Sequence, residues 1–316
     1  MKAVVVGAGS VGATVAYACL LRGAVDNLLL YDIDEAKAVA QGLDLAHSIQ
    51  FTAMARVGGT GDLTACAGAD VIVLAAGAKQ KPGQSRLDLA ASNVAMCRSV
   101  LPALLAGSPA ALLLVVTNPV DVVTRAALEF SGLPVGRVIG TGTVLDTGRL
   151  RALLARRCGV AVQNVHAHVL GEHGDSGFAV WSAAAIAGVP LARWDAVLGG
   201  PPSAAERAAM LGEVRGAAQR IIAGKGATNF AIGGVAARII EAVGRNERRV
   251  LPVSTYLARY RGIDDVCLSV PCVLDGTGRA AVLDVPMQPD EDAGLAASAE
   301  TLRLACAASG ADGSAG

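Results

Sequence analysis

Aromatic and charged residues are scarce in this chain of 316 residues. Phe, Trp and Tyr together make up 3% of it, charged residues 17% and hydrophobic residues 53%. Few aromatic rings leave few platforms for stacking bases, and a formal net charge of zero gives no basic surface for nucleic acid or an anionic membrane. We therefore expect a globular protein of two domains, or one large one, with an aliphatic core and neither nucleic acid nor a membrane as partner.

Cysteine occurs in a number and arrangement that disfavour cross-links. The seven cysteines are odd in number and scattered, and they include no C-x-x-C pair. A disulfide framework or zinc site is therefore not expected, and the thiols are predicted to be small buried hydrophobes in the reducing cytoplasm. His166-Ala-His168 would place two imidazoles on one strand face, but too few other ligands lie nearby, so we predict no metal site.

The first uncharged run, residues 3–21, is long enough to resemble a membrane span or a signal sequence. Gly7, Gly9 and Gly12 interrupt it, together with two hydroxyl residues. A buried strand, a glycine turn and a helix explain the same run better than a membrane segment does.

Strand-like and helix-like segments alternate over the first 140 residues. The strands are continuous apolar runs rather than alternating ones, which is typical of a parallel sheet covered on both faces. Strands are predicted at 2–6, 28–31, 71–75 and 111–117, and helices at 12–22, 35–48, 87–105 and 120–131. We predict an α/β dinucleotide-binding domain at 1–140, with a doubly wound parallel sheet and a mobile loop at about 78–88.

The pattern changes after residue 140. A strand at 165–170 and a hairpin formed by 266–274 and 280–285 are set among helices at 146–158, 203–223, 229–243 and 289–308. This mixture predicts an α+β domain at 141–308, and the polar clusters described below make it the expected substrate or catalytic domain. The Gly/Ser/Ala-rich tail at 309–316 is expected to be disordered.

The segment Gly7-Ala-Gly9-Ser-Val-Gly12 follows the first strand and opens the first helix. Asp32 lies twenty residues after Gly12, at the end of the next strand, which completes the dinucleotide-binding pattern of a Rossmann-type domain. Gly7 would allow the tight turn, Gly9 the approach of a pyrophosphate and Gly12 close helix packing. Because Asp32 would accept from ribose hydroxyls and repel a 2′-phosphate, we predict NAD as the cofactor.

Four polar clusters follow predicted strands: 79–86, 118–119, 146–149 and 171–175. Asp146 and Arg149 are three apart on a helix and share a face, and His173 lies in a glycine-flanked turn. Taken singly, the first two could form a surface ion pair and His173 could be simply solvated. Their occurrence together behind a dinucleotide pattern predicts a catalytic site.

At these clusters the sequence resembles the L-lactate/malate dehydrogenase family, and most of all its bacterial L-lactate dehydrogenases. The resemblance extends to about residue 308. The segments that carry it are GAGSVG, LYDID, AAGAKQKPGQSRLDL, VTNPVD, GTGTVLDTGRLR, NVHAHVLGEHGDS and GKGATNF.

The resemblance implies a role for each polar cluster. His173 would exchange a proton with the substrate oxygen, and Asp146 would orient its ring. Arg149 would clamp the substrate carboxylate, while Arg86 on the closing loop would polarise the carbonyl. The remaining assignments are Asn118, which would contact both substrate and cofactor, Thr228 and Gln80 at the substrate, and Val11 beside Gly7, Gly9, Gly12 and Asp32 at NAD.

Gln80 stands where malate-specific relatives place an arginine, and a neutral side chain cannot pair with a second carboxylate. Glu172 before His173 is also lactate-like within the family. Pyruvate and lactate are thus the expected substrates, with malate or a larger 2-hydroxy acid as alternatives. The expected setting is glycolysis and fermentation in the cytoplasm.

Two rivals come from other classes. An NAD-dependent glycosidase of the same architecture would need a Cys/His metal site, and a non-enzymatic NAD-binding regulator would have no need of His173, Asp146 and Arg149. The family also implies a homotetramer or dimer, which the helices at 203–223 and 229–243 could support. Arg151 and His166 match a pair that binds fructose 1,6-bisphosphate in bacterial lactate dehydrogenases, so allosteric activation is a further expectation.

Overall fold

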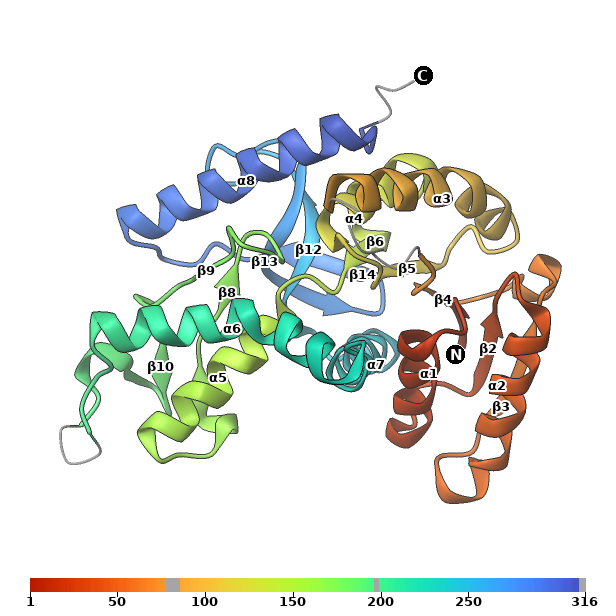
Figure 1. Ribbon diagram of the computed structural model, residues 1–316, viewed down its shortest axis with the longest axis horizontal. Helices are drawn as coiled ribbons and strands as arrows, with labels where there is room; N and C mark the ends of the chain where they lie inside the picture. The colour runs from red at the N-terminus through yellow and green to blue at the C-terminus, as the bar shows by residue number, and fades with distance from the viewer. Residues whose placement is uncertain (78–85, 196–198, 313–316) are drawn as a thin grey trace.

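A nine-stranded sheet runs through the molecule (Figure 1), in the order β14-β13-β12-β6-β5-β4-β1-β2-β3. The computed structural model describes residues 1–77, 86–195 and 199–312, and for residues 86 and 87 it describes the backbone alone. The strands of this sheet are β1 (Lys2–Val6), β2 (Asn27–Tyr31), β3 (Arg56–Thr60), β4 (Val71–Leu74), β5 (Leu112–Val115), β6 (Val138–Gly140), β12 (Arg249–Leu257), β13 (Val266–Asp275) and β14 (Gly278–Val282).

The first six strands are parallel, which confirms the predicted doubly wound sheet. Their order, 6-5-4-1-2-3, reverses direction between β1 and β4. Because crossovers of this kind are right-handed, helices on either side of the reversal cover opposite faces. The helices concerned are α1 (Ser10–Arg22) and α2 (Glu35–His47) on one face, and α3 (Arg86–Ala106) and α4 (Val120–Ser131) on the other.

Strand β3 was not predicted, because Gly58 and Gly59 weaken its strand signal. The structure explains these glycines. A Cβ on Gly59 would lie 1.8 Å from the carbonyl oxygen of Ala38, and one on Gly42 would lie 2.5 Å from the Gly59 nitrogen. The glycines therefore allow α2 to pack directly on the backbone of β3.

The C-terminal hairpin extends the sheet of parallel strands. Strand β12, which was not predicted, pairs antiparallel with β13, and its Ser254 pairs with Gly140 of β6. The parallel strands and the antiparallel strands thus form one sheet. The predicted domain boundary near residue 140 therefore divides this sheet between β6 and β12.

Helices α7 (Phe230–Gly244) and α8 (Pro289–Ser309) pack on the core of the large sheet. The other elements of this half surround a smaller core. They are α5 (Val144–Cys158) and α6 (Ala204–Lys225), with the short strands β7 (Val165–His166), β8 (Val169–Leu170), β9 (Phe178–Ala179), β10 (Ala185–Ile186) and β11 (Val189–Pro190). The single strand expected at 165–170 is therefore two strands, which pair with β10 and β9 respectively. Leu150, Leu154, Ile186 and Val214 are among the buried residues of this core.

The N-terminal end of the chain agrees with the prediction, whereas the C-terminal end differs from it. The uncharged run at 3–21 forms β1, the glycine turn and α1, as expected. At the other end, α8 continues to Ser309 and Ala311 is fully buried, so residues 309–312 are packed rather than disordered. Residues 88–106 of α3 have the length and composition of a membrane span, but 44% of that window is buried within the fold, as in a core helix. All seven cysteines are buried and free of disulfides.

Helix α7 joins the C-terminal half of the chain to the N-terminal half by packing along α1 (Figure 1). A Cβ on Gly233 would lie 2.5 Å from the Thr14 side chain, and Asn229 Nδ2 donates to Thr14 Oγ1 over 3.0 Å. The buried residues of α7 are Gly233 and seven of those at 236–243, whereas Phe230, Ala231 and Gly234 are exposed. About half of the segment that was expected to support subunit contacts is thus buried in its own chain.

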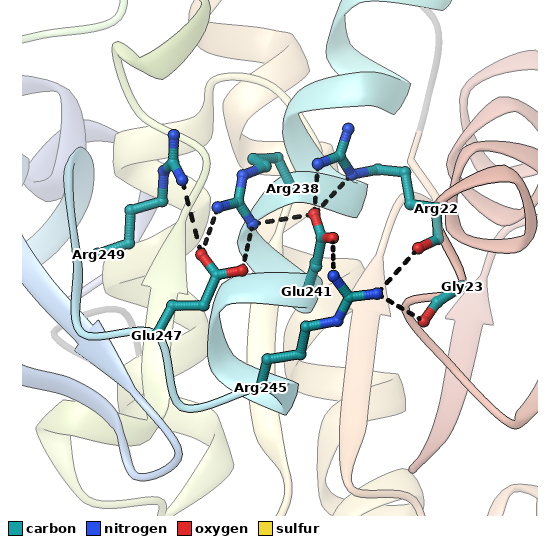
Figure 2. A network of polar contacts seen from close by, with 7 residues as sticks. All are labelled: Arg22, Gly23, Arg238, Glu241, Arg245, Glu247 and Arg249. Carbon is teal, nitrogen blue, oxygen red and sulfur yellow. Dashed lines mark hydrogen bonds and ion pairs between the residues drawn. The ribbon is translucent and has the colours of Figure 1, made fainter.

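Glu241 lies near the C-terminal end of α7, at the far end of the seam between α1 and α7 (Figure 2). Its carboxylate accepts from Arg22 Nε over 2.7 Å, from Arg238 Nη1 over 2.9 Å and from Arg245 Nη1 over 2.5 Å. The Glu241 side chain is 7% exposed. Burial alone would raise its pKa, but the hydrogen bonds and charges of the three arginines, Arg22 foremost, lower it.

We expect Glu241→Gln to lower the free energy of unfolding at pH 7 by about 2 kcal/mol, because the charge that faces three arginines is lost and an NH2 group replaces one of the two acceptor oxygens. The lowered pKa makes this contribution present above the ordinary pKa of 4.5 and lost as the pH falls through the lower folded-state value. Urea unfolding at pH 7 and at pH 3–4 measures both effects. Glu129→Gln, which removes a 39% exposed partner of Arg125, is the control and should change stability by less than ~0.5 kcal/mol. Equal stability of Glu241→Gln and the control would contradict the prediction.

Candidate active site

The carboxyl ends of the parallel strands meet at one edge of the sheet, where open α/β sheets bind ligands. Thr117, just after β5, donates through its hydroxyl to the carbonyl of Ala76 after β4, over 2.5 Å. Asn93 of α3 donates to the carbonyl of Asn118 over 2.7 Å. The Asn118 side chain is exposed at this edge, which is the position that the sequence predicts for it.

His173 and Asp146 come together here although 27 residues separate them. Asp146 lies in the first turn of α5 and His173 in the turn after β8, and their Oδ2 and Nδ1 atoms are 2.5 Å apart. Arg149, one turn along α5, donates from Nη1 to the other oxygen of Asp146 over 3.0 Å. The predicted ion pair is thus part of a three-residue array, whose side chains are 27%, 10% and 17% exposed in the order His173, Asp146, Arg149.

The electrostatics of this array favour a protonated histidine. Burial by itself lowers the pKa of His173, but the charge of Asp146 and its hydrogen bond outweigh this, and the net pKa is raised. Burial would likewise raise the pKa of Asp146, yet His173 and Arg149 hold it below its usual range. Asp146 therefore stays ionised, and His173 holds a proton to a higher pH than a free imidazole.

Hydrogen bonds from residues that the sequence analysis missed hold the segment around His173 in place. The amide of His173 donates to Oδ2 of Asp121, on α4, over 2.8 Å. The amide of Glu172 donates to the hydroxyl of Ser298, on α8, over 3.0 Å, and that hydroxyl donates to the carbonyl of Ser176 over 2.9 Å. Helices α4 and α8 thus hold the main chain of this turn, and α5 holds the ring of His173 through Asp146. Asp121 does lie in the recognised segment VTNPVD, but its spacing did not indicate a contact with His173.

The glycine loop has the geometry predicted for a phosphate-binding turn. Gly7 has φ +104°, and a Cβ there would lie 2.6 Å from the Ala76 nitrogen. A Cβ on Gly12 would lie 1.8 Å from the Gly7 oxygen, so α1 packs tightly on the turn. The space in front of Gly9 holds no described atom within 4 Å, and no side chain caps the N-terminus of α1. The N–H groups of this helix start are therefore available to a pyrophosphate.

Asp32 stands at the end of β2 and is 14% exposed. Its Oδ2 accepts from the amide of Ala8 in the glycine loop over 2.7 Å, and Oδ1 accepts from the amide of Asp34 over 3.1 Å. Burial would raise the pKa of Asp32, but these hydrogen bonds and Lys37 lower it. Lys37 Nζ lies 3.2 Å from Oδ2, a neighbour that the sequence analysis did not identify.

Several predicted residues lie elsewhere or outside the description. Thr228 is partly buried in the link between α6 and α7, and Val11 is partly buried at the start of α1. Gln80, the proposed mobile loop up to residue 85, and the side chain of Arg86 lie outside the described residues. Within the described ranges, no group of three His, Cys, Asp or Glu side chains is placed to hold a metal ion. The array that an NAD-dependent glycosidase would need is thus not found there.

Arg151 and His166, the pair proposed for the effector site, lie on elements that contact each other. Arg151 Nε donates over 2.9 Å to the carbonyl of Ala167, the residue after His166. His166 is exposed on β7, and burial together with the charges of Arg151 and His166 lowers the pKa of His168 to about 4. The pKa of Arg151 is itself lowered by burial and by Arg249, a further cation of this cluster.

Known proteins match the chain over almost its full length. Residues 1–140 match the lactate/malate dehydrogenase NAD binding domain, and residues 143–309 match the alpha/beta C-terminal domain of the same family. An L-lactate dehydrogenase of Bifidobacterium animalis subsp. lactis is 46% identical over 303 residues, which are 96% of this chain and 95% of that protein. One from Synechococcus sp. is 44% identical over 307 residues, covering 96% and 97% respectively.

Solved structures agree with these sequence matches. A lactate dehydrogenase from a Medee basin deep-sea metagenome library has a TM-score of 0.92 and 36% identity, and the match covers 98% of both chains. The minor L-lactate dehydrogenase of Enterococcus mundtii, in a ligands-bound form, has the same TM-score and identity and covers 97% of both. The fold, the glycine loop and the matches over nearly every residue lead to one conclusion: this chain belongs to the lactate/malate dehydrogenase family, and its first 140 residues are that family's NAD-binding domain.

Proposed function

We propose that the chain is an NAD-dependent L-lactate dehydrogenase, an enzyme that interconverts pyruvate and L-lactate. The observation that carries the proposal is the pairing of His173 with Asp146 and Arg149 at the carboxyl edge of the NAD-binding sheet. The relatives at 44–46% identity are named L-lactate dehydrogenases, which supports the same activity.

His173 is the proton donor for pyruvate reduction. With NADH bound, a hydride would be delivered to the keto carbon, and negative charge would develop on the carbonyl oxygen. A protonated His173, favoured by Asp146, donates its proton to that oxygen, and the neutral ring accepts it back during lactate oxidation. Because its pKa is raised, pyruvate reduction should persist to a higher pH than with an ordinary histidine and then decline.

The other polar residues orient the substrate. Arg149 presents a planar guanidinium to the substrate carboxylate, since its bond to Asp146 uses one nitrogen only among the described contacts. Asn118 contacts the carbonyl and the nicotinamide ribose, Thr228 lines the pocket, and Arg86 polarises the carbonyl while its loop excludes water. The glycine loop binds the pyrophosphate, and Asp32 binds the adenosine ribose.

The neutral Gln80 favours pyruvate over oxaloacetate, because a second carboxylate would find no cation at that position. A larger 2-hydroxy acid or malate is the alternative substrate. A non-enzymatic NAD-binding regulator is the alternative of another class. The presence of the complete His173, Asp146 and Arg149 array argues for an enzyme.

The function is tested by NADH oxidation at 340 nm with pyruvate, oxaloacetate, 2-ketobutyrate, 2-ketoisocaproate and phenylpyruvate. Pyruvate should give the highest kcat/KM, and Gln80→Arg should shift the preference toward oxaloacetate. His173→Asn is the matched control for contaminating activity and should lower kcat at least ~100-fold, the share of general acid–base catalysis. A wild-type preference for oxaloacetate would refute the role of Gln80, and no turnover with any keto acid would refute the enzyme.

For the cofactor, we expect NADH to bind more tightly than NADPH, because Asp32 repels a 2′-phosphate. Asp32→Ser should narrow this difference about tenfold, equivalent to ~1.4 kcal/mol, and it releases Lys37 for the phosphate. Adding Lys37→Gln to Asp32→Ser should widen the gap again. Calorimetric titration of both cofactors into each variant measures this, and equal affinities of the wild type for NADH and NADPH would count against the assignment.

Regulation by fructose 1,6-bisphosphate is a further part of the proposal. Arg151, Arg249 and the exposed His166 supply positive charge and donors, which a phosphate group requires. Arg151 shares α5 with Arg149, and the strand of His166 leads toward the turn of His173. A shift of either element on phosphate binding would therefore move the carboxylate clamp or the acid.

We expect fructose 1,6-bisphosphate to lower the apparent KM for pyruvate in the wild type and to have no effect in Arg151→Gln. Saturation curves at pH 6, 7 and 8 make the measurement. Arg156→Gln, an exposed arginine on the same helix, is the matched control and should keep the response. A wild-type curve that does not respond at any of the three pH values would refute the effector site.

A cytoplasmic homotetramer acting in glycolysis and fermentation is the setting we propose. Exposed apolar side chains on and after α2 support subunit contacts in place of α7, about half of which is buried. They are Val39, Leu43, Phe51 and Met54, between 47% and 84% exposed.

A further inference from the structure

Asp121 is a buried carboxyl group with no role in the reaction as described so far. It lies in the first turn of α4 and is 2% exposed. Its Oδ2 accepts the main-chain N–H of His173 over 2.8 Å, a contact that spans 52 residues of sequence. A carboxylate placed on the amide of the residue that exchanges the proton is in a position to act on that residue.

His173 is therefore held by two carboxyl groups from two different helices. Asp146 of α5 contacts the ring at Nδ1, whereas Asp121 of α4 contacts the main chain. Ser298 already holds the neighbouring amide of Glu172, and Asp121 adds a contact at the main chain of His173 itself, between Gly171 and Gly174. Anchoring both ends of the residue restricts the position of the imidazole relative to the sheet edge.

We propose that Asp121 is a positioning residue for His173, which fixes its main chain and, through its negative charge, favours the protonated imidazole. The proposal rests on the proposed function, in which His173 donates the proton to pyruvate. Asp121 does not contact the substrate, so its effect passes through His173.

The charges around the pair agree with this role. Burial raises the pKa of Asp121 to about 6, while the Ser254 hydroxyl, the His173 amide and the His173 charge oppose the rise and Glu172 adds to it. Asp121 in turn raises the pKa of His173, in the same direction as Asp146 and against Arg149. Asp121 is thus ionised at neutral pH, where its charge can act.

The remaining titratable groups near Asp121 do not compete in this range. Cys267 of β13 and Cys306 of α8 face it, and burial raises the pKa of both thiols, that of Cys306 to about 12. Both thiols are neutral at the pH of the experiment. Glu172, on the segment of His173, is the other carboxyl group that acts on Asp121.

The test separates charge from anchoring with two variants. Asp121→Asn keeps an acceptor oxygen and the side-chain volume but removes the charge, whereas Asp121→Ala removes both. The pKa of His173 is measured without turnover from the rate of its acylation by diethyl pyrocarbonate between pH 5.5 and 8, since the reagent attacks the neutral imidazole. The signal is assigned to His173 by subtracting the same variant with His173→Asn added.

We expect the midpoint of His173 acylation to move to lower pH in both variants. The kcat/KM for pyruvate at pH 8 should fall about tenfold in Asp121→Asn, because less His173 is protonated, and further in Asp121→Ala, because the main chain is no longer held. At a pH well below the midpoint Asp121→Asn should recover most of its activity, whereas Asp121→Ala should not. A merely structural aspartate would give no such recovery.

Asp275→Asn is the matched control. Asp275 is 8% exposed and accepts a backbone N–H, that of Thr277, over the same 2.8 Å, but in the turn between β13 and β14. It should leave the His173 midpoint unchanged. The proposal is overturned if Asp121→Asn leaves the midpoint at the wild-type pH, or if Asp275→Asn moves it equally.

The two proposals fail in different ways. A wild type that does not reduce pyruvate would refute the proposed function, whereas the acylation midpoints would still report whether Asp121 acts on His173. Normal wild-type turnover with unshifted midpoints in the Asp121 variants would refute the role of Asp121 alone.

Discussion

The contact between Asp146 and His173 is the interaction on which the candidate site depends. It requires the first turn of α5 and the turn after β8 to lie side by side, so that Asp146 Oδ2 is 2.5 Å from His173 Nδ1. Two threonines hold these segments together: Thr143, the N-cap of α5, and Thr147 within α5. Thr143 Oγ1 donates to the carbonyl of Val169, and the amide of Val169 donates to Thr147 Oγ1. The helix start also favours a negative charge on Asp146, through the N-terminal end of the helix dipole. The acid–base pair is thus held by α5, which follows directly from the last parallel strand.

Continuity between the two halves of the molecule gives this contact its place relative to the cofactor loop. Strand β1 ends at the glycine loop, and the antiparallel strands of the other half continue the same sheet. The seam between α1 and α7 adds a second connection, locked at one end by Gly233 against Thr14 and at the other by Glu241 among three arginines (Figure 2). A hydride transfer requires donor and acceptor to be aligned closely, so two connections between cofactor half and substrate half serve the chemistry directly.

Two buried aspartates near His173 illustrate how environment separates identical groups. Arg149 and His173 lower the pKa of Asp146. Among the described residues, no arginine contributes to the pKa of Asp121, and burial raises it to about 6. Asp146 therefore stays ionised beside the imidazole, whereas Asp121 is ionised at neutral pH and becomes protonated as the pH falls. The same chemical group thus contributes differently to the proton held by His173.

The sequence by itself determined the parallel sheet, the glycine loop, Asp32 and the polar clusters at the strand ends. These features are local, since strand periodicity, glycine spacing and the three-residue step from Asp146 to Arg149 depend on the backbone within a few residues. The family resemblance rested on the same short segments. By contrast, only the tertiary structure decided that β12 to β14 join the cofactor sheet, that α7 packs on α1, that Lys37 reaches Asp32, and that Asp121 and Ser298 hold the turn of His173. Each of these joins residues that the packing of helices on the sheet brings together. The physical reason is that a side chain's type and spacing record its local geometry, whereas its partner across the fold is selected by burial and close packing of the whole chain.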